Sequence, residues 1–318
     1  MPRLSVLMPA FDAAATIERA VRSTLADLPA DAELVVADDG SADDTLRVLG
    51  RISDRRLRVV TGPNRGVART LNMLLEITDS ELVARMDADD TGLPGRFVRQ
   101  VRALGEADAV FTTIVTARGG VPRPPWPSGI APAAFPFHLL LTNPVAHSTL
   151  TARRSAVDAA GGYRVVPSED YDLWLRMAVR GSRMRRLASP GVLYRVHARQ
   201  VTAADGWRLA SWQDETTQTA FADLSEQLLG ARQQRIVALA ASPSSQADRL
   251  ARFAEFERLF RAAANPLRAA ERRVLLRRLR QRAEWLRHRT DAPASPDGDR
   301  TRRSEAAGSA FSPAGERR

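Results

Sequence analysis

The first ninety residues alternate short apolar runs with segments of helical periodicity, and this alternation is the strongest constraint on the fold. The runs that we expect to be strands are residues 4–8, 34–37, 57–60 and 82–86. The segments that we expect to be helices are residues 13–28, 43–52 and 67–77. Strands that alternate with helices form βαβ units, whose parallel sheet is covered on both faces. We therefore predict an α/β fold with a Rossmann-like, mostly parallel sheet flanked by helices.

Polar residues follow directly after three of these strands, in the segments 9–12, 38–41 and 87–90. In such sheets, ligands bind beyond the carboxyl ends of the strands. The pair Asp87 and Asp89 is notable, because neighbouring carboxylates repel each other unless a cation or hydrogen-bond donors compensate them. Their oxygen atoms suit Mg²⁺ or Mn²⁺, which share their coordination with substrate phosphates. The pair predicts a diphosphate and metal site; a structural turn is the alternative.

Residue usage excludes several kinds of chemistry. All 47 basic residues are arginines, and the chain has neither lysine nor cysteine. Schiff-base formation, P-loop phosphate binding by lysine, thiol nucleophiles, disulfides and thiolate metal sites are therefore excluded. Any catalysis must use carboxylates, histidine, hydroxyl groups, arginine or a bound metal.

Five segments in a fixed order resemble the family 2 glycosyltransferases of GT-A fold. They are Ser5–Phe11, Val35–Ser41, Asn64–Arg69, Ala84–Asp90 and Ser168–Leu175. The resemblance covers roughly residues 3–200 and does not reach the C-terminal third. It implies a metal-dependent, inverting transfer of a sugar from a nucleoside-diphosphate donor, often a UDP-sugar, to an acceptor hydroxyl. The acceptor would be a glycan, a lipid-linked sugar or a small molecule, in cell-surface polysaccharide or glycoconjugate synthesis.

The resemblance also assigns donor-side residues. Those assigned to the nucleotide sugar are Pro9, Ala10, Phe11, Asp39, Asn64, Gly66, Arg69, Asp87 and Ala88. Those assigned to Mn²⁺ or Mg²⁺ are Asp87, Asp89 and His197, with a surface histidine as the alternative for His197. Phe11 and Asp12 stand where the family more often has tyrosine and asparagine, and the lost hydroxyl leaves stacking on the base intact.

The segment that begins at Glu169 supplies the acceptor side in this resemblance. Asp170 would be the general base, which must lie within hydrogen-bond reach of the acceptor hydroxyl and opposite the leaving diphosphate. A buried helix start with Asp170 as its cap is the alternative. Glu169, Trp174 and His147 would lie on the acceptor side, and for His147 packing or hydrogen bonding is the alternative to a chemical role.

Three regions follow from the pattern along the chain. We predict a catalytic domain over residues 1–204, a helical region over 205–290 with breaks at 242–245 and 265–266, and a disordered tail over 291–318. Glycine and proline predict that residues 117–137 lack regular structure, as a mobile loop over the site or as an ordinary connector. No run approaches the roughly 20 apolar residues of a membrane span, and no signal-peptide pattern is seen, so we expect a cytoplasmic location.

The formal net charge of +10 is concentrated toward the C-terminus, where residues 205–318 hold 21 arginines against 15 acidic residues. Within the arginine-rich segment 267–289, Leu275, Leu279, Ala283 and Leu286 recur at helical spacing. Such a helix can lie on an anionic membrane, or can pack on the catalytic domain or a second subunit. Nucleic-acid binding is disfavoured because no stacking platform or known module is present. A sugar nucleotidyltransferase is disfavoured by the absence of lysine.

Overall fold

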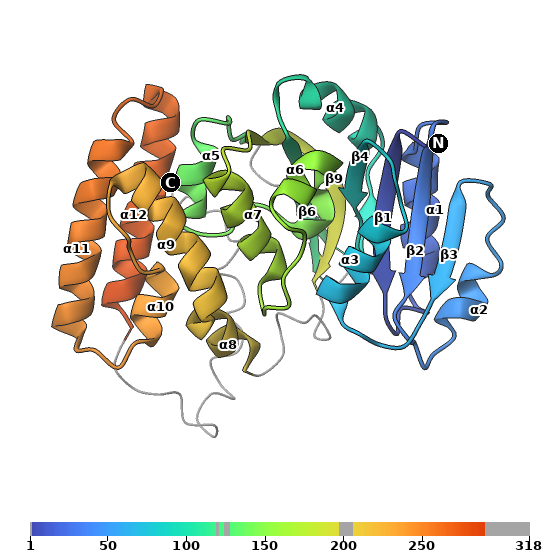
Figure 1. Ribbon diagram of the computed structural model, residues 1–318, viewed down its shortest axis with the longest axis horizontal. Coiled ribbons are helices and arrows are strands. Elements are labelled where there is room, and N and C mark those ends of the chain that lie inside the picture. Colours follow the sequence, from blue (N-terminus) through green and yellow to red (C-terminus); the bar gives the residue numbers. More distant parts are fainter. Residues whose placement is uncertain (1, 119–120, 124–127, 197–205, 290–318) are drawn as a thin grey trace.

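One mixed sheet runs through the protein, as the computed structural model shows for residues 2–118, 121–123, 128–196 and 206–289 (Figure 1). Its strands are β1 (Leu4–Ala10), β2 (Ala32–Asp38), β3 (Leu57–Thr61), β4 (Leu82–Arg85), β5 (Thr91–Gly92), β6 (Ala109–Arg118), β7 (Val121–Arg123), β8 (Thr151–Arg153) and β9 (Met184–Val196). Their order in the sheet is β3-β2-β1-β4-β8-β6-β9-β5, and β7 pairs with β6.

The first four strands are parallel, as the sequence predicts. β1 lies between β2 and β4, and Leu7 pairs with Val35 on one side and Arg85 on the other. Beyond β4 the sheet is mixed, because β8 runs antiparallel to both β4 and β6 while β9 runs parallel to β6. The carboxyl ends of β1, β2 and β4 therefore share one edge, which is where the three polar segments of the sequence meet.

Helices cover both faces of the sheet. They are α1 (Ile17–Asp27), α2 (Thr45–Leu49), α3 (Val67–Glu76), α4 (Arg96–Ala103), α5 (Phe135–Leu139), α6 (Arg154–Ala159), α7 (Glu169–Val179), α8 (Trp207–Gln213), α9 (Glu215–Leu229), α10 (Ile236–Ala241), α11 (Gln246–Ala263) and α12 (Ala269–Arg287), with 3₁₀ turns η1 (Leu104–Glu106) and η2 (His147–Thr149). Alternate residues of β1 point to opposite faces: Val6 joins the core under α1, and Leu7 joins the core under α3. The predicted α/β class is confirmed.

The C-terminal helices continue the core on the α3 face. Figure 1 shows α9 to α12 beside α7, at the end of the molecule away from β3. The core that contains Leu7 also buries four residues of α12, namely Leu275, Leu279, Ala283 and Leu286. The rings of Phe137 and Phe260 meet edge-on, with their centroids 5.6 Å apart. The prediction that α12 packs on the catalytic domain is thus confirmed. The alternative prediction, that the apolar face of residues 267–289 contacts a membrane, is wrong because the protein's own core covers that face.

The expectation that residues 117–137 lack regular structure is wrong at three places, the first being the end of β6 at Arg118, and residues 119–120 and 124–127 lie outside the described residues. Val121–Arg123 forms the edge strand β7, where Pro122 is tolerated because an edge strand leaves some N–H groups unpaired. α5 begins at Phe135 with a proline in its first turn, a position that needs no N–H. The predicted breaks at 242–245 and 265–266 are confirmed as the connections on either side of α11.

One predicted boundary and one predicted region meet the limits of the described structure. The boundary at residue 204 falls within 197–205, and the tail 291–318 lies wholly outside the described residues. Among the described residues, no helix is both long enough and apolar enough to cross a membrane.

Candidate active site

The loops after β2 and β3 are locked together at the shared edge of the sheet. Gly40 has φ of 78°, and a Cβ there would lie 2.7 Å from the backbone nitrogen of Asn64, so only glycine fits. Next to it, the Asp39 carboxylate accepts hydrogen bonds from the backbone N–H groups of Arg65 (3.0 Å) and Gly66 (2.9 Å). Asp39 therefore fixes the segment that contains Asn64, Gly66 and Arg69, the residues predicted to contact the nucleotide sugar. All three are exposed.

A cavity of about 270 Å³ opens at this junction. Its lining includes Asp38, Asp39, Thr61, Gly62, Pro63 and Arg65. Pro9 is half-buried and Ala10 buried at the end of β1, whereas the Phe11 ring that follows is 52% exposed and free to stack on a planar ligand. Asp12 has φ of 46°, and its carboxylate accepts from the Ala42 N–H at 2.9 Å, so it ties this loop to the loop after β2.

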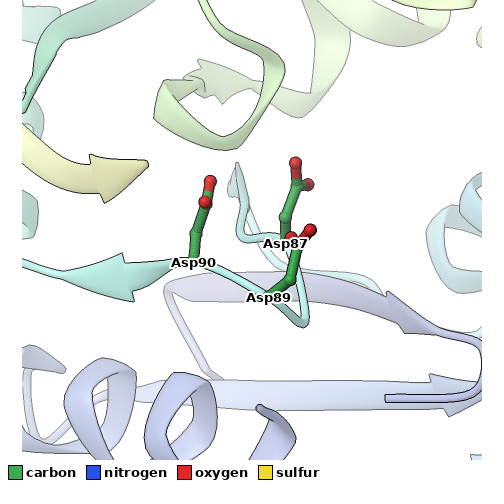
Figure 2. A group of neighbouring side chains, drawn as sticks. All are labelled: Asp87, Asp89 and Asp90. Carbon is green, nitrogen blue, oxygen red and sulfur yellow. The ribbon is translucent and has the colours of Figure 1, made fainter. Parts of the chain in front are cut away.

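Three carboxylates form an acidic group in the loop between β4 and β5. Figure 2 shows the side chains of Asp87, Asp89 and Asp90 rising from this loop, and one ligand atom from each lies within 4.8 Å of the others. Ala88 between them is buried. β5 holds the far end of the loop through its pairing with β9. Three clustered carboxylates form the hard oxygen donor set that Mg²⁺ and Mn²⁺ prefer.

Two buried arginines hold the backbone around this acidic group. Arg85 pairs with Asp87 (Nη2 to Oδ1, 2.8 Å), and Arg96 donates to the Arg85 carbonyl at 2.7 Å. Arg96 is 0% exposed, and burial lowers its pKa to about 10. Its hydrogen bonds to carbonyl oxygens, and one to Gln100 (2.9 Å), repay part of the cost of its burial.

Asp90 is the most buried carboxylate of the group. It accepts hydrogen bonds from Ser148 Oγ (2.7 Å) and from the backbone N–H of Arg195 (3.2 Å), near the end of β9. Burial, together with the charges of Asp87 and Asp89, raises the pKa of Asp90 well above its usual value. His197, the predicted additional ligand, lies outside the described residues.

Asp170 lies in the first turn of α7. Its Oδ2 accepts from Asn143 Nδ2 at 2.8 Å, and its Oδ1 accepts from the Tyr171 N–H at 2.6 Å. Burial raises the pKa of Asp170 to about 6, and the neighbouring charge of Glu169 adds to the shift. Burial also raises the pKa of Glu169 to about 7. A carboxylate with a pKa of about 6 is suited to accept a proton near neutral pH.

His147 lies between the phenol of Tyr163 and the carboxylate of Glu169. Its Nε2 is 3.0 Å from Tyr163 Oη, and its Nδ1 is 3.5 Å from Glu169 Oε1. Burial and the Arg85 charge lower the pKa of His147 to about 4, so the ring is neutral and hydrogen-bonded at neutral pH. Trp174 is 0% exposed and meets His147 edge-on at 5.9 Å, so it supports His147 from the core and offers no surface to an acceptor.

The predicted donor-side and acceptor-side groups lie within reach of each other's charges. The charges of both Arg85 and Asp87 act on the titration of Glu169 and of His147. The structure thus brings the acidic group and the start of α7 together, although they are about eighty residues apart in the sequence.

Several residues of the site escaped the sequence analysis. They are Arg85, Asp90 as a member of the acidic group, Arg96, Asn143, Ser148 and Tyr163. Arg85 carried a usable signal, because an arginine inside an apolar strand must find a partner when the strand is buried. Asn143 and Tyr163 carried none, because their partners lie 27 and 16 residues away along the chain.

Comparison with known proteins decides the family. The family model described as glycosyl transferase family 2 matches residues 5–162. EpsE of Bacillus subtilis (strain 168) is 31% identical over an alignment of 214 residues, and the match covers 61% of this chain and 73% of EpsE. The chain belongs to glycosyl transferase family 2. The sequence-based prediction of this family and of its GT-A fold is confirmed, and the non-enzymatic alternative is set aside.

Two further proteins are similar to this glycosyltransferase. The UDP-Glc:alpha-D-GlcNAc-diphosphoundecaprenol beta-1,3-glucosyltransferase WfaP of Escherichia coli is 26% identical, over 64% of this chain and 81% of WfaP. The mannosyltransferase PcManGT from Pyrobaculum calidifontis, solved in complex with GDP-Man and Mn²⁺, superposes with a TM-score of 0.53. That match covers 90% of this chain and 87% of the other at 20% identity, and it shows a shared fold.

Proposed function

We propose that this glycosyltransferase moves a sugar from a nucleoside-diphosphate donor, a UDP-sugar, to a hydroxyl group of a cell-surface glycan or of its lipid-linked precursor, with inversion at the anomeric carbon. One observation carries the proposal: a buried carboxylate with a raised pKa, Asp170, shares an electrostatic site with the acidic group of Asp87, Asp89 and Asp90. A carboxylate base on one side and a metal-binding donor set on the other are what a single displacement requires.

On the donor side, Asp87, Asp89 and Asp90 would hold Mn²⁺ or Mg²⁺. A divalent metal bound there supplies positive charge to the diphosphate that leaves. Phe11 offers a face on which the base can stack. Asp39 already accepts two backbone hydrogen bonds, but a carboxylate has about four acceptor positions, so about two remain and one of these can accept an N–H of the base.

On the acceptor side, Asp170 takes the proton of the acceptor hydroxyl. The acceptor oxygen forms a bond to the anomeric carbon while the bond from that carbon to the diphosphate oxygen breaks. Asn143 orients Asp170 and favours its ionised form through the 2.8 Å hydrogen bond. Positioning and electrostatics then provide most of the rate.

The relatives support this choice of substrates. WfaP is named for a UDP-glucose donor and for an acceptor sugar linked through a diphosphate to a lipid. PcManGT was solved with a nucleotide sugar and Mn²⁺ together, which agrees with a metal site in the same fold.

A screen of nucleotide sugars tests the proposal. Thermal unfolding and donor hydrolysis are measured with UDP-, GDP-, ADP- and dTDP-sugars, each with Mn²⁺ and with EDTA. We expect a UDP-sugar to raise Tm and to be hydrolysed only when the metal is present. If no nucleotide sugar raises Tm or is hydrolysed with Mn²⁺, the proposal is wrong.

A further inference from the structure

Four arginines gather where the C-terminal helices meet the catalytic domain. We call Arg186, Arg235, Arg278 and Arg282 the arginine cluster. Arg186 lies on β9, Arg235 precedes α10, and Arg278 and Arg282 lie one turn apart on α12. Arg235 is buried and the other three are half-buried, so the cluster can be reached from solvent.

The members share surroundings in the fold, because Arg235 lies over the Tyr171 ring at 5.3 Å and α12 packs into the core that contains Tyr171. The charge of Arg278 acts on both Arg186 and Arg282, and those of Arg235 and Arg282 act on the Tyr171 phenol. Burial lowers the pKa of all four arginines, that of Arg186 to about 10. Folding thus brings four cations together and partly dehydrates them, which is unfavourable unless something compensates them.

The described part of the chain supplies little of that compensation. The charge of Asp214 favours the ionised form of Arg235, and no carboxylate in this part of the chain acts on the other three members. Arg186 donates to the carbonyls of Pro144 (2.6 Å) and Ser128 (3.0 Å), and Arg235 donates to the Ser211 carbonyl (2.8 Å). Arg282 lies over the Trp285 ring at 5.9 Å, and the Tyr171 phenol acts on its charge. Among the described residues, no member of the cluster forms an ion pair, and the buried Nε atoms of Arg186 and Arg235 have no hydrogen-bond partner.

Nearby arginines show that this arrangement is not the rule in the C-terminal region. Arg232 pairs with Asp223 at 2.7 Å and with Glu226 at 3.0 Å, and Arg261 pairs with Glu257 at 2.6 Å. These arginines carry their own counter-charges, whereas the arginine cluster has donors to spare.

Two sets of contacts connect the arginine cluster to the proposed general base, Asp170. Arg235 lies over the Tyr171 ring at 5.3 Å, and Tyr171 follows Asp170 in α7. Arg186 donates to the carbonyl of Pro144, and Pro144 follows Asn143, whose amide donates to Asp170. The cluster therefore contacts the chain neighbours of both Asp170 and the asparagine that donates to it.

We propose that the arginine cluster binds a phosphate or diphosphate group of the acceptor, and so selects acceptors that carry such a group close to the reacting hydroxyl. Guanidinium groups suit this ligand because their paired N–H donors match phosphate oxygens. The inference rests on the proposed function, since it takes Asp170 to face the acceptor.

Inorganic pyrophosphate is the probe for a direct test. Its affinity is measured by calorimetry in EDTA, where the acidic group holds no metal and repels the anion. The test variant is Arg278→Gln/Arg282→Gln. The matched control is Arg277→Gln/Arg280→Gln, which removes the same charge from exposed positions of the same helix. We expect the test variant to lose at least about tenfold in affinity and the control to bind like wild type. Equal affinity in both variants would overturn the proposal.

Stability provides a second readout, which separates binding from folding. Pyrophosphate in EDTA should raise the Tm of wild type and of the control but not that of the test variant, whatever the Tm of each protein without the ligand. An equal rise in the test variant and the control would contradict an anion site at Arg278 and Arg282.

Competition identifies the source of the phosphate. A short-chain prenyl diphosphate sugar and a glycerol phosphate polymer are each tested for displacement of pyrophosphate. Displacement by the first supports a lipid-linked acceptor, displacement by the second supports a phosphate-bearing polymer, and displacement by neither overturns the assignment to the acceptor. UDP binding with Mn²⁺ on the same wild-type sample shows separately whether the proposed function holds.

Discussion

The acidic group and the arginine cluster are opposite in charge but alike in physical character. Each gathers like charges that folding alone disfavours, and each is only partly compensated within the described chain. They differ in how the sequence encodes them. The three aspartates lie within four consecutive residues at one strand end, whereas the four arginines come from three separate parts of the chain. The proposed donor half of the site is therefore local in the sequence and lies within the segment that the family model matches, while the proposed acceptor half depends on long-range packing.

The largest effect is expected from a substitution that removes the proposed general base and leaves donor binding intact. Asp170→Asn should lower turnover by about 10²–10⁴, the usual contribution of a general base, because the amide cannot accept the hydroxyl proton. Steady-state kinetics measures turnover, and calorimetry with UDP and Mn²⁺ should give unchanged affinity. Wild-type turnover in this variant would remove Asp170 from the mechanism.

The converse substitution removes a proposed metal ligand from the donor half of the site. Asp89→Ala should weaken Mn²⁺-dependent UDP binding by at least about 10–100-fold, the range seen when even an outer-shell partner of a metal is lost. Calorimetry with and without EDTA measures the effect. Asp223→Ala, at an exposed carboxylate of α9, is the control and should bind like wild type. Unchanged UDP affinity in Asp89→Ala would argue against a metal at the acidic group.

A smaller effect is expected at the base-stacking surface. Phe11→Ala should weaken UDP binding by roughly 5–150-fold, which corresponds to the 1–3 kcal/mol that stacking on an aromatic ring contributes. Phe11→Tyr keeps the ring and should bind within about twofold of wild type. Equal losses in the two variants would show that Phe11 does not stack on the base.

The smallest expected effect concerns pH. Because Asp170 must be ionised to accept a proton, turnover should rise as pH increases through its pKa of about 6. The hydrogen bond from Asn143 favours the ionised form, so Asn143→Ala should move this rise to higher pH by about one unit. The pH profile of kcat provides the measurement. An unshifted profile would mean that Asn143 does not tune the base.

The raised pKa of Asp170 also affects stability: turnover should rise as pH increases, whereas this group's contribution to folding stability should fall. Since folding raises the pKa of Asp170 from about 4 to about 6, the folded state holds the proton more tightly in this interval, and ionisation destabilises it as pH rises. Asp170→Asn should remove this contribution. Its Tm relative to wild type should therefore be higher at pH 7 than at pH 4.

The sequence predicts the position of the acidic group well for a physical reason. Parallel strands and their carboxyl-end loops are local features, so the pattern of residues is enough to place Asp87 and Asp89 at a sheet edge. The groups that support these aspartates are not local. Ser148 reaches Asp90 across 58 residues, and Arg195 reaches it across 105. No periodicity in the sequence encodes such contacts.

The C-terminal half illustrates the opposite limit. The spacing of Leu275, Leu279, Ala283 and Leu286 predicts an amphipathic helix, and the helix is present. The pattern alone could not tell whether a membrane or the protein core covers its apolar face, because both are apolar environments. Only tertiary packing shows that the core covers this face, and that the charge of Arg278 acts on Arg186.

The anomeric configuration of the first product tests the account most directly. Single displacement with Asp170 as the only base requires inversion. With the donor that the nucleotide-sugar screen identifies, ¹H NMR of the product in the earliest turnovers should show the configuration opposite to that of the donor, a β-linked sugar from an α-linked donor. Retention of the donor configuration would contradict the mechanism and the assignment of the donor and acceptor halves to one displacement.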